Sequence, residues 1–296
     1  MSNLVIDHGN PWWLSPNVWA VPTSNPNEPS PGEISPVVNS QYFLVANVRN
    51  TSSSDVLNAE VYFWWANPSL GILTTANANL VGKSQVSVVG NGSNTSLELS
   101  AWTPTFVNNG HECLIAAVVE GGGPPPTVLD GANDPTVAQH NLGVVNIVGQ
   151  MEGRFSYPFQ VCNPFRIEQR FTIHAERAPI EQVAPFLASL RDAPSGVVKG
   201  AAKGAEKRVS SETEQDALKL GFVNEVSLHP RDFHHAKPLL EDVRLSPFAC
   251  TGFTLVGVLE KSEDLIHVTQ RIGNRIVGGL SVLVLLEKEH GYERRS

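Results

Sequence analysis

The sequence predicts a mainly β protein with two tandem β-sandwich domains, residues 1–148 and 149–296. Short apolar runs alternate with polar residues and are separated by clusters of Gly, Asn, Ser and Pro, as in strands joined by turns. All six tryptophans lie in the first 102 residues. The first half has two basic and ten acidic residues and the second half 19 of each, so the formal charge of -8 belongs to the first half. This contrast indicates two folding units, for which 296 residues suffice.

The first domain is expected to open with an extended segment. Residues 11–36 are rich in Pro, Asn and Ser, a composition that disfavours central strands. We expect this segment to lie across the first sandwich and to be held there by Trp12, Trp13 or Trp19.

Short strands separated by turns account for the rest of the first half. Residues 44–49 alternate in polarity, and residues 59–65 add aromatic and β-branched side chains. The polar cluster at residues 50–55 indicates the turn between them. Residues 113–119 are continuously apolar, as expected for a strand buried on both faces. The strands expected here are residues 44–49, 59–65, 85–89, 95–100, 113–120 and 142–148.

The second half combines strands with a helical excursion. Apolar residues recur at helical spacing after Pro179, which suits a first helical position. Residues 197–220 are rich in Ala, Lys and Glu and indicate a solvated helix, a mobile insert or both. We therefore expect a helical excursion over about residues 179–220. The strands expected around it are residues 155–162, 169–175, 222–229, 251–260, 265–270 and 275–287.

Residues 42–65 resemble the cell-adhesion-related domain found in bacteria, in which a V-x-V-x-N strand precedes a polar turn and a second apolar strand. The resemblance covers about residues 10–148 and implies an immunoglobulin-like sandwich for the first domain. The second half shows a looser similarity, so we expect two tandem immunoglobulin-like domains. This fold hosts many roles, so no catalytic residue is carried over. The residues that carry the resemblance are Asn47, Val48, Asn50, Ala59, Val61, Phe63, Trp13–Trp19, Trp102–Pro104, His111–Leu114, Cys162–Pro164 and Gly278–Leu280.

Aromatic side chains of the first domain are the candidate binding residues. An exposed aromatic row can stack on sugar rings or anchor a protein partner. Strand alternation predicts that Trp65 lies in the core with Phe63, whereas Trp64 lies outside with Tyr62. Alternatively, the N-terminal segment covers Trp64. The candidate binding residues are Trp12, Trp13, Trp19, Tyr62 and Trp64.

The densest polar cluster comprises His229, Asp232, His234 and His235, residue types that can ligate zinc. Their spacing matches no established metal motif, and the cluster contains a proline, so we interpret it as a polar loop. The run at residues 130–134 offers oxygen ligands but lacks the order of a calcium loop, which indicates an ordinary turn. We expect no metal site and no cofactor.

No pattern of a catalytic nucleophile is present. The chain contains no G-x-S-x-G motif, and the glycine-rich run at residues 121–126 lacks the Lys-Ser/Thr of a phosphate loop. Cys113, Cys162 and Cys250 are far apart and odd in number, so we expect no disulfide framework. Two of them lie in apolar runs, where cysteine acts as a small buried hydrophobe. We therefore expect a protein that is not an enzyme.

Composition excludes several classes of partner. The net acidity argues against nucleic-acid binding, which needs clustered Lys and Arg. No apolar run of about 18 residues exists, so we expect no transmembrane segment and no membrane insertion. The start of the chain lacks the pattern of a signal peptide. We expect a cytoplasmic protein or one exported by a signal-peptide-independent route.

These observations favour a non-enzymatic structural or binding protein. It would be a component or cargo of a bacterial surface, secretion or phage-like assembly and would bind a protein partner or a second copy of itself. One alternative is a carbohydrate-binding module, which requires at least two coplanar exposed rings. The other is a metal-dependent enzyme around His229, His234 and His235.

Overall fold

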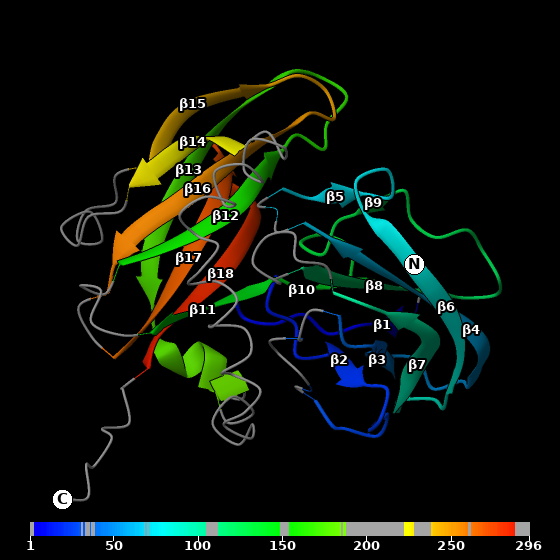
Figure 1. Ribbon diagram of the computed structural model, residues 1–296. Coiled ribbons are helices and arrows are strands. Elements are labelled where there is room, and N and C mark those ends of the chain that lie inside the picture. Colours follow the sequence, from blue (N-terminus) through cyan, green and yellow to red (C-terminus); the bar gives the residue numbers. More distant parts are fainter. Residues whose placement is uncertain are drawn as a thin grey trace, which may run out of the picture.

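Strands dominate the computed structural model and form two β-rich units that lie side by side (Figure 1). We call them the first unit, up to His140, and the second unit, from Leu142 onward; Asn141 joins them. The structure describes residues 3–30, 32, 36, 39–67, 69, 71–104, 112–148, 154–184, 186–187, 222–227, 238–259 and 262–287.

Two four-stranded sheets pack face to face in the first unit. In one sheet β3 pairs with β1, β2 and β7, and the other sheet has the order β10-β8-β4-β6. Alternate residues from both sheets, such as Leu44, Val61 and Leu114, bury their side chains in one shared core. The strands are β1 (Leu4–Val5), β2 (Val18–Pro22), β3 (Tyr42–Asn50), β4 (Val56–Ala66), β6 (Asn79–Val88), β7 (Ser93–Trp102), β8 (Cys113–Val119) and β10 (Val137–His140).

A two-stranded ribbon covers the outer face of the second of these sheets. It consists of β5 (Leu73–Thr74) and β9 (Val128–Leu129), whose leucines pack against Trp64. The expected alternation along β4 is confirmed, because Phe63 lies in the core between the sheets and Trp64 on the opposite face. Trp64 is nevertheless buried, and the ribbon covers it rather than the N-terminal segment.

The second unit also pairs two sheets around one core. A five-stranded sheet has the order β11-β18-β17-β13-β15, and a three-stranded sheet has the order β12-β16-β14. Phe159 and Leu255 from the smaller sheet pack against Phe171, Val268 and Val282 from the larger one. The strands are β11 (Leu142–Val148), β12 (Arg154–Cys162), β13 (Gln169–Ala178), β14 (Phe222–Ser227), β15 (Leu240–Leu245), β16 (Cys250–Val258), β17 (Glu263–Ile272) and β18 (Arg275–Glu287).

The strand at residues 142–148 belongs to the second unit, not to the first. β11 runs parallel to β18, with Leu142 beside Ser281 and Val144 beside Leu283. The expected boundary at residue 148 therefore moves to Asn141. Local polarity predicted this strand correctly but says nothing about its partner, which lies more than 130 residues further along the chain.

A disulfide joins Cys162 and Cys250, although the number and spacing of the cysteines predicted no disulfide framework. The two residues are direct partners on the antiparallel strands β12 and β16, although 88 positions separate them in the sequence. Strand register therefore creates a pair that cysteine spacing does not reveal. Among the described residues, Cys113 is the free cysteine and is buried.

The expected helical excursion over about residues 179–220 is not confirmed, because only a short helical turn after β13 is described. A 3-10 helix, η2 (Ile180–Val183), starts after Pro179, and Ala184, Phe186 and Leu187 continue with helical geometry. Residues 188–220 of the expected excursion lie outside the described residues. Within the part of the chain that the structure describes, no helix is long and apolar enough to cross a membrane.

Reduction of the Cys162–Cys250 disulfide is expected to lower the free energy of unfolding of the second unit. The chain-entropy model gives about 4.6 kcal/mol for a closed loop of this length. Urea unfolding with and without a reductant, followed by circular dichroism, measures the difference. The double variant Cys162→Ala, Cys250→Ala is the control and should not respond to the reductant. An unchanged unfolding curve for the reduced wild type would contradict the prediction.

Candidate functional site

The junction between the two units is the candidate functional site. Residues 6–17, which we call the N-terminal segment from here on, leave the first unit at Trp13 and Leu14. Both of these side chains are buried against the second unit. Residues from β11, β17, β18 and the turn around η2 complete this apolar cluster, which we call the junction core. Its buried members are Trp13, Leu14, Leu142, Val183, Phe186, Leu187, Leu265 and Leu283.

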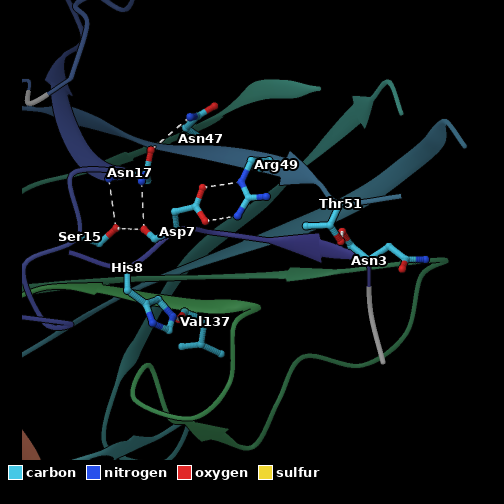
Figure 2. Close-up of polar contacts among 9 residues, drawn as sticks. All are labelled: Asn3, Asp7, His8, Ser15, Asn17, Asn47, Arg49, Thr51 and Val137. Carbon is cyan, nitrogen blue, oxygen red and sulfur yellow. Dashed lines mark hydrogen bonds and ion pairs between the residues drawn. The ribbon is translucent and has the colours of Figure 1, made fainter. Parts of the chain in front are cut away.

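Polar contacts hold the N-terminal segment on the first sheet of the first unit (Figure 2). The Arg49 guanidinium on β3 binds both carboxylate oxygens of Asp7, with Nε 2.7 Å from Oδ2. This pair holds the pKa of Asp7 below its usual value. Ser15 Oγ and Asn17 Nδ2 donate to the Asp7 carbonyl at 2.7 and 3.0 Å. The segment therefore folds back on itself beside β3, where Asn47 donates to the Asn17 side chain.

The same segment is also tied to the opposite sheet. His8 Nε2 lies 2.9 Å from the carbonyl oxygen of Val137 on β10, as Figure 2 shows. The backbone N–H of Ile6 donates to the Pro135 carbonyl, and that of Ser15 donates to the Gln139 carbonyl, both at 3.0 Å. The segment thus bridges both sheets of the first unit before it reaches the second.

Trp13 fits a slot on β18 and β17 of the second unit. Its indole Nε1 donates to Ser281 Oγ at 3.0 Å, and its ring meets the His267 ring edge-on at 5.7 Å. A Cβ at position 279 would lie 2.6 Å from the Trp13 ring, so the glycine at this position permits the close approach. Only 3% of Trp13 is exposed.

A chain of hydrogen bonds continues from Trp13 into the second unit. Ser281 Oγ lies 2.8 Å from His267 Nδ1, and His267 Nε2 lies 2.6 Å from Gln182 Oε1. An amide oxygen can only accept, so Nε2 carries the proton and Nδ1 accepts from Ser281. Burial lowers the pKa of His267 to about 4, which keeps the ring neutral near pH 7.

Asn141 hydrogen-bonds to three segments at the centre of the junction: the N-terminal segment, the residues around Ser69 and β18. Its Nδ2 donates to the carbonyls of Ser69 and Gly279, both at 3.0 Å. Its backbone N–H donates to the Trp13 carbonyl at 2.9 Å, and its own carbonyl accepts from Ser281 N–H at 3.0 Å. Asn141 is fully buried, so these bonds replace water that the side chain and backbone would otherwise bind.

His140 and Trp12 extend the junction on its first-unit side. His140 Nδ1 lies 3.0 Å from the Ser15 carbonyl, and its ring packs against Phe186 with centroids 5.0 Å apart. Burial lowers the pKa of His140. Trp12 is half-buried, stands perpendicular to Trp13 and lies beside Gly131 of the first unit.

The structure separates the five predicted binding aromatics. Trp12 and Trp13 lie at the junction, Trp19 on the outer face of the β3 sheet, and Tyr62 and Trp64 on the outer face of the β4 sheet. Tyr62 and Trp64 stack at 5.9 Å with an angle of 20°, but only 2% of Trp64 is exposed. Trp13 and Trp19 are buried as well, whereas Trp12 and Tyr62 are half-buried. These residues therefore do not form one exposed row.

Trp19 holds part of the proline-rich segment, residues 11–36, against the first sandwich. This contact was expected for Trp12, Trp13 or Trp19. Its Nε1 donates to the Glu28 carbonyl at 3.2 Å. Gly32 lies so close to the Trp19 ring that a Cβ there would be 2.4 Å from a ring carbon. Residues 18–22 of this segment form β2 within the β3 sheet, and Glu28 and Gly32 lie against the Trp19 ring on the outer face of that sheet.

The predicted metal candidates His229, Asp232, His234 and His235 lie outside the described residues. Within the described ranges, no group of three or more His, Cys, Asp or Glu residues could hold a metal ion. The acidic run at residues 130–134 forms a turn, because the Asp130 carboxylate accepts the N–H groups of the two residues that follow Gly131, both at 3.1 Å.

Ser281 and His267 have the spacing of a nucleophile and its base, but their surroundings prevent that use. Ser281 is fully buried, and its oxygen already accepts from Trp13. The third group is the amide of Gln182, which cannot stabilise an imidazolium as a carboxylate does. The arrangement therefore links Trp13 of the first unit to Ser281, His267 and Gln182 of the second.

Comparisons with known proteins do not assign the chain to a family. No family model matches it, and no curated protein matches it either. A transglutaminase of red sea bream shares 10% identity, with coverage of 92% of this chain and 31% of that one and a TM-score of 0.22. A β-glucosidase from Streptomyces venezuelae in complex with D-glucose shares 12% identity, with coverage of 38% and 14% and a TM-score of 0.20. The chain thus spans less than a third of either structure, and these likenesses carry no argument about its function.

Trp13→Ala is expected to cost about 3–5 kcal/mol of stability, because it empties the junction core and leaves Ser281 without its donor. Urea unfolding followed by circular dichroism gives the free energy. Trp12→Ala is the matched control: this neighbouring ring is half-buried, so its loss should cost less. Equal losses for the two variants would contradict the role given to Trp13.

Proposed function

We propose that the protein is a non-enzymatic structural or binding protein in which two immunoglobulin-like sandwiches act as one rigid body. Strand order supports the immunoglobulin-like assignment. In the first unit an antiparallel sheet of β1, β2, β3 and β7 faces an antiparallel sheet of β10, β8, β4 and β6, and two antiparallel sheets packed in this way are typical of such domains. In the second unit the first strand runs parallel to the last, while β12 and β16 pair in the opposing sheet.

The junction core is the observation that carries this proposal. Most loosely linked domains meet through small polar interfaces and move relative to one another. Here an indole from the first unit is buried in the second, and Asn141 hydrogen-bonds to both units. Such an interior fixes the angle between the sandwiches, which suits a protein that must present surfaces at a set distance.

The partner is proposed to be a protein or a second copy of this chain, within a bacterial surface, secretion or phage-like assembly. The first unit supplies an acidic surface, because its two basic residues, Arg49 and Lys83, both pair with carboxylates. The Cys162–Cys250 disulfide supports the exported rather than the cytoplasmic alternative, since disulfides persist in oxidising compartments.

The carbohydrate-binding alternative has less support. It needs at least two coplanar exposed rings, and the one nearly parallel pair among the candidate aromatics, Tyr62 with Trp64, offers only a half-buried Tyr62 beside a buried Trp64. The metal-dependent alternative depends on His229, His234 and His235, which lie outside the described residues.

Small-angle X-ray scattering at neutral pH, with light scattering and elemental analysis of the same sample, tests the proposal. We expect the scattering of one rigid particle for the wild type and that of two mobile bodies for Trp13→Ala, because the variant loses the junction core. Lys83→Ala, which removes an ion pair between β6 and β4 of the first unit, should scatter like the wild type. A flexible wild type would contradict rigid coupling, and stoichiometric zinc would favour the metal-dependent alternative.

A further inference from the structure

We propose that the junction is an acid-sensitive coupling, in which protonation of His267 and His140 releases the η2 segment and Trp13 and frees the two sandwiches from one another. The inference rests on the proposed rigid coupling and adds a condition under which the coupling is lost. Its basis is that both imidazoles are buried and contact the same short segment, His267 through Gln182 and His140 through Phe186.

The hydrogen bonds of His267 suit only the neutral ring. Nε2–H donates to Gln182, and Nδ1 accepts from Ser281, whose oxygen accepts from Trp13. A proton on Nδ1 would turn that nitrogen into a donor toward Ser281 Oγ. The serine oxygen would then accept from two donors, and its own hydrogen would lose its acceptor in a buried site.

The groups around His267 do not compensate a positive charge. β18 contributes Ser281, the N-terminal segment Trp13 and η2 Gln182, all uncharged. On β13 the direct strand partner is Glu176, whose side chain is exposed and therefore screened by water. The exposed Glu181 neighbours Gln182 in η2.

Protonation of His140, in the first unit, is expected to weaken the junction as protonation of His267 does. Its strand partner is Leu114, its bridge partner is Leu14, and its polar contact is the Ser15 carbonyl. These neighbours and the Phe186 ring are uncharged, so an imidazolium there would be buried with no carboxylate among the described contacts of the His140 ring. Two charges on opposite sides of one apolar cluster would therefore favour separation.

The direction of the pH effect follows from the lowered pKa of both rings. The usual histidine pKa is 6.5, and that of His267 in the folded protein is about 4. The released state binds protons at higher pH than the coupled state does, so acid favours release. The coupling is complete above about pH 6.5 and weakens as the pH falls toward 4.

Scattering and circular dichroism between pH 7.5 and 4 test the inference. We expect the wild type to change from one rigid particle to two mobile bodies while its β signal persists. The double variant His140→Gln, His267→Gln should stay rigid over the same range, because both imidazoles whose protonation releases the junction have been removed.

Gln182→Glu keeps the test decisive if the double variant does not fold. A carboxylate in place of the amide would hold protonated His267, so release should move to lower pH by about one unit or more. Glu181→Gln, also in η2, is the matched control and should release like the wild type.

Each outcome decides one question. A wild type that is rigid at pH 7.5 and still rigid at pH 4 would overturn the acid-sensitive coupling and leave the proposed function standing. Release at the same pH in the wild type, the double variant and Gln182→Glu would also overturn it, since other groups would then be responsible. A wild type that is already flexible at pH 7.5 would instead overturn the proposed rigid coupling.

Discussion

The burial of one indole ring across two sandwiches is the constraint on which the arrangement depends. Trp13 can reach its slot because the N-terminal segment is first fixed to both sheets of the first unit, through Asp7 and His8 among others. It fits because position 279 has no side chain, and it is held because Ser281 accepts its N–H. The N-terminal segment and the paired strands β11 and β18 therefore all contact one another around the Trp13 ring.

Much of the fold could be predicted from local pattern. The alternation at residues 59–65 correctly divided Phe63 from Trp64, and the apolar run at 113–119 is indeed buried on both faces. Short strands such as β10 and β15 were not predicted from the sequence, because four to six residues give too little periodicity. The pairing of strands could not be predicted either, because nothing in the sequence near Leu142 indicates that its partner is Ser281.

The site could be predicted only in part. The tryptophans correctly indicated that the N-terminal segment makes important contacts. The sequence does not show, however, whether a large apolar ring contacts a ligand or another domain of the same chain. Asn141, Gln182, His267 and Ser281 belong to no motif and lie far apart in the chain, so only the three-dimensional structure brings them together. The disulfide could not be predicted for the same reason: its cysteines lie far apart in the chain and become direct partners only through the register of β12 and β16.

The position of Asn141 bears on how the chain can be divided experimentally. Tandem sandwiches are commonly produced as separate fragments cut at the linker, but here the linker residue is itself fully buried and hydrogen-bonded to both units. A fragment ending before it would carry a bare Trp13 and Leu14 on its surface, and the remaining piece would expose Leu265 and Leu283. The two halves are structurally distinct yet not interchangeable modules, and insertions, deletions or fusions at this linker would disturb both.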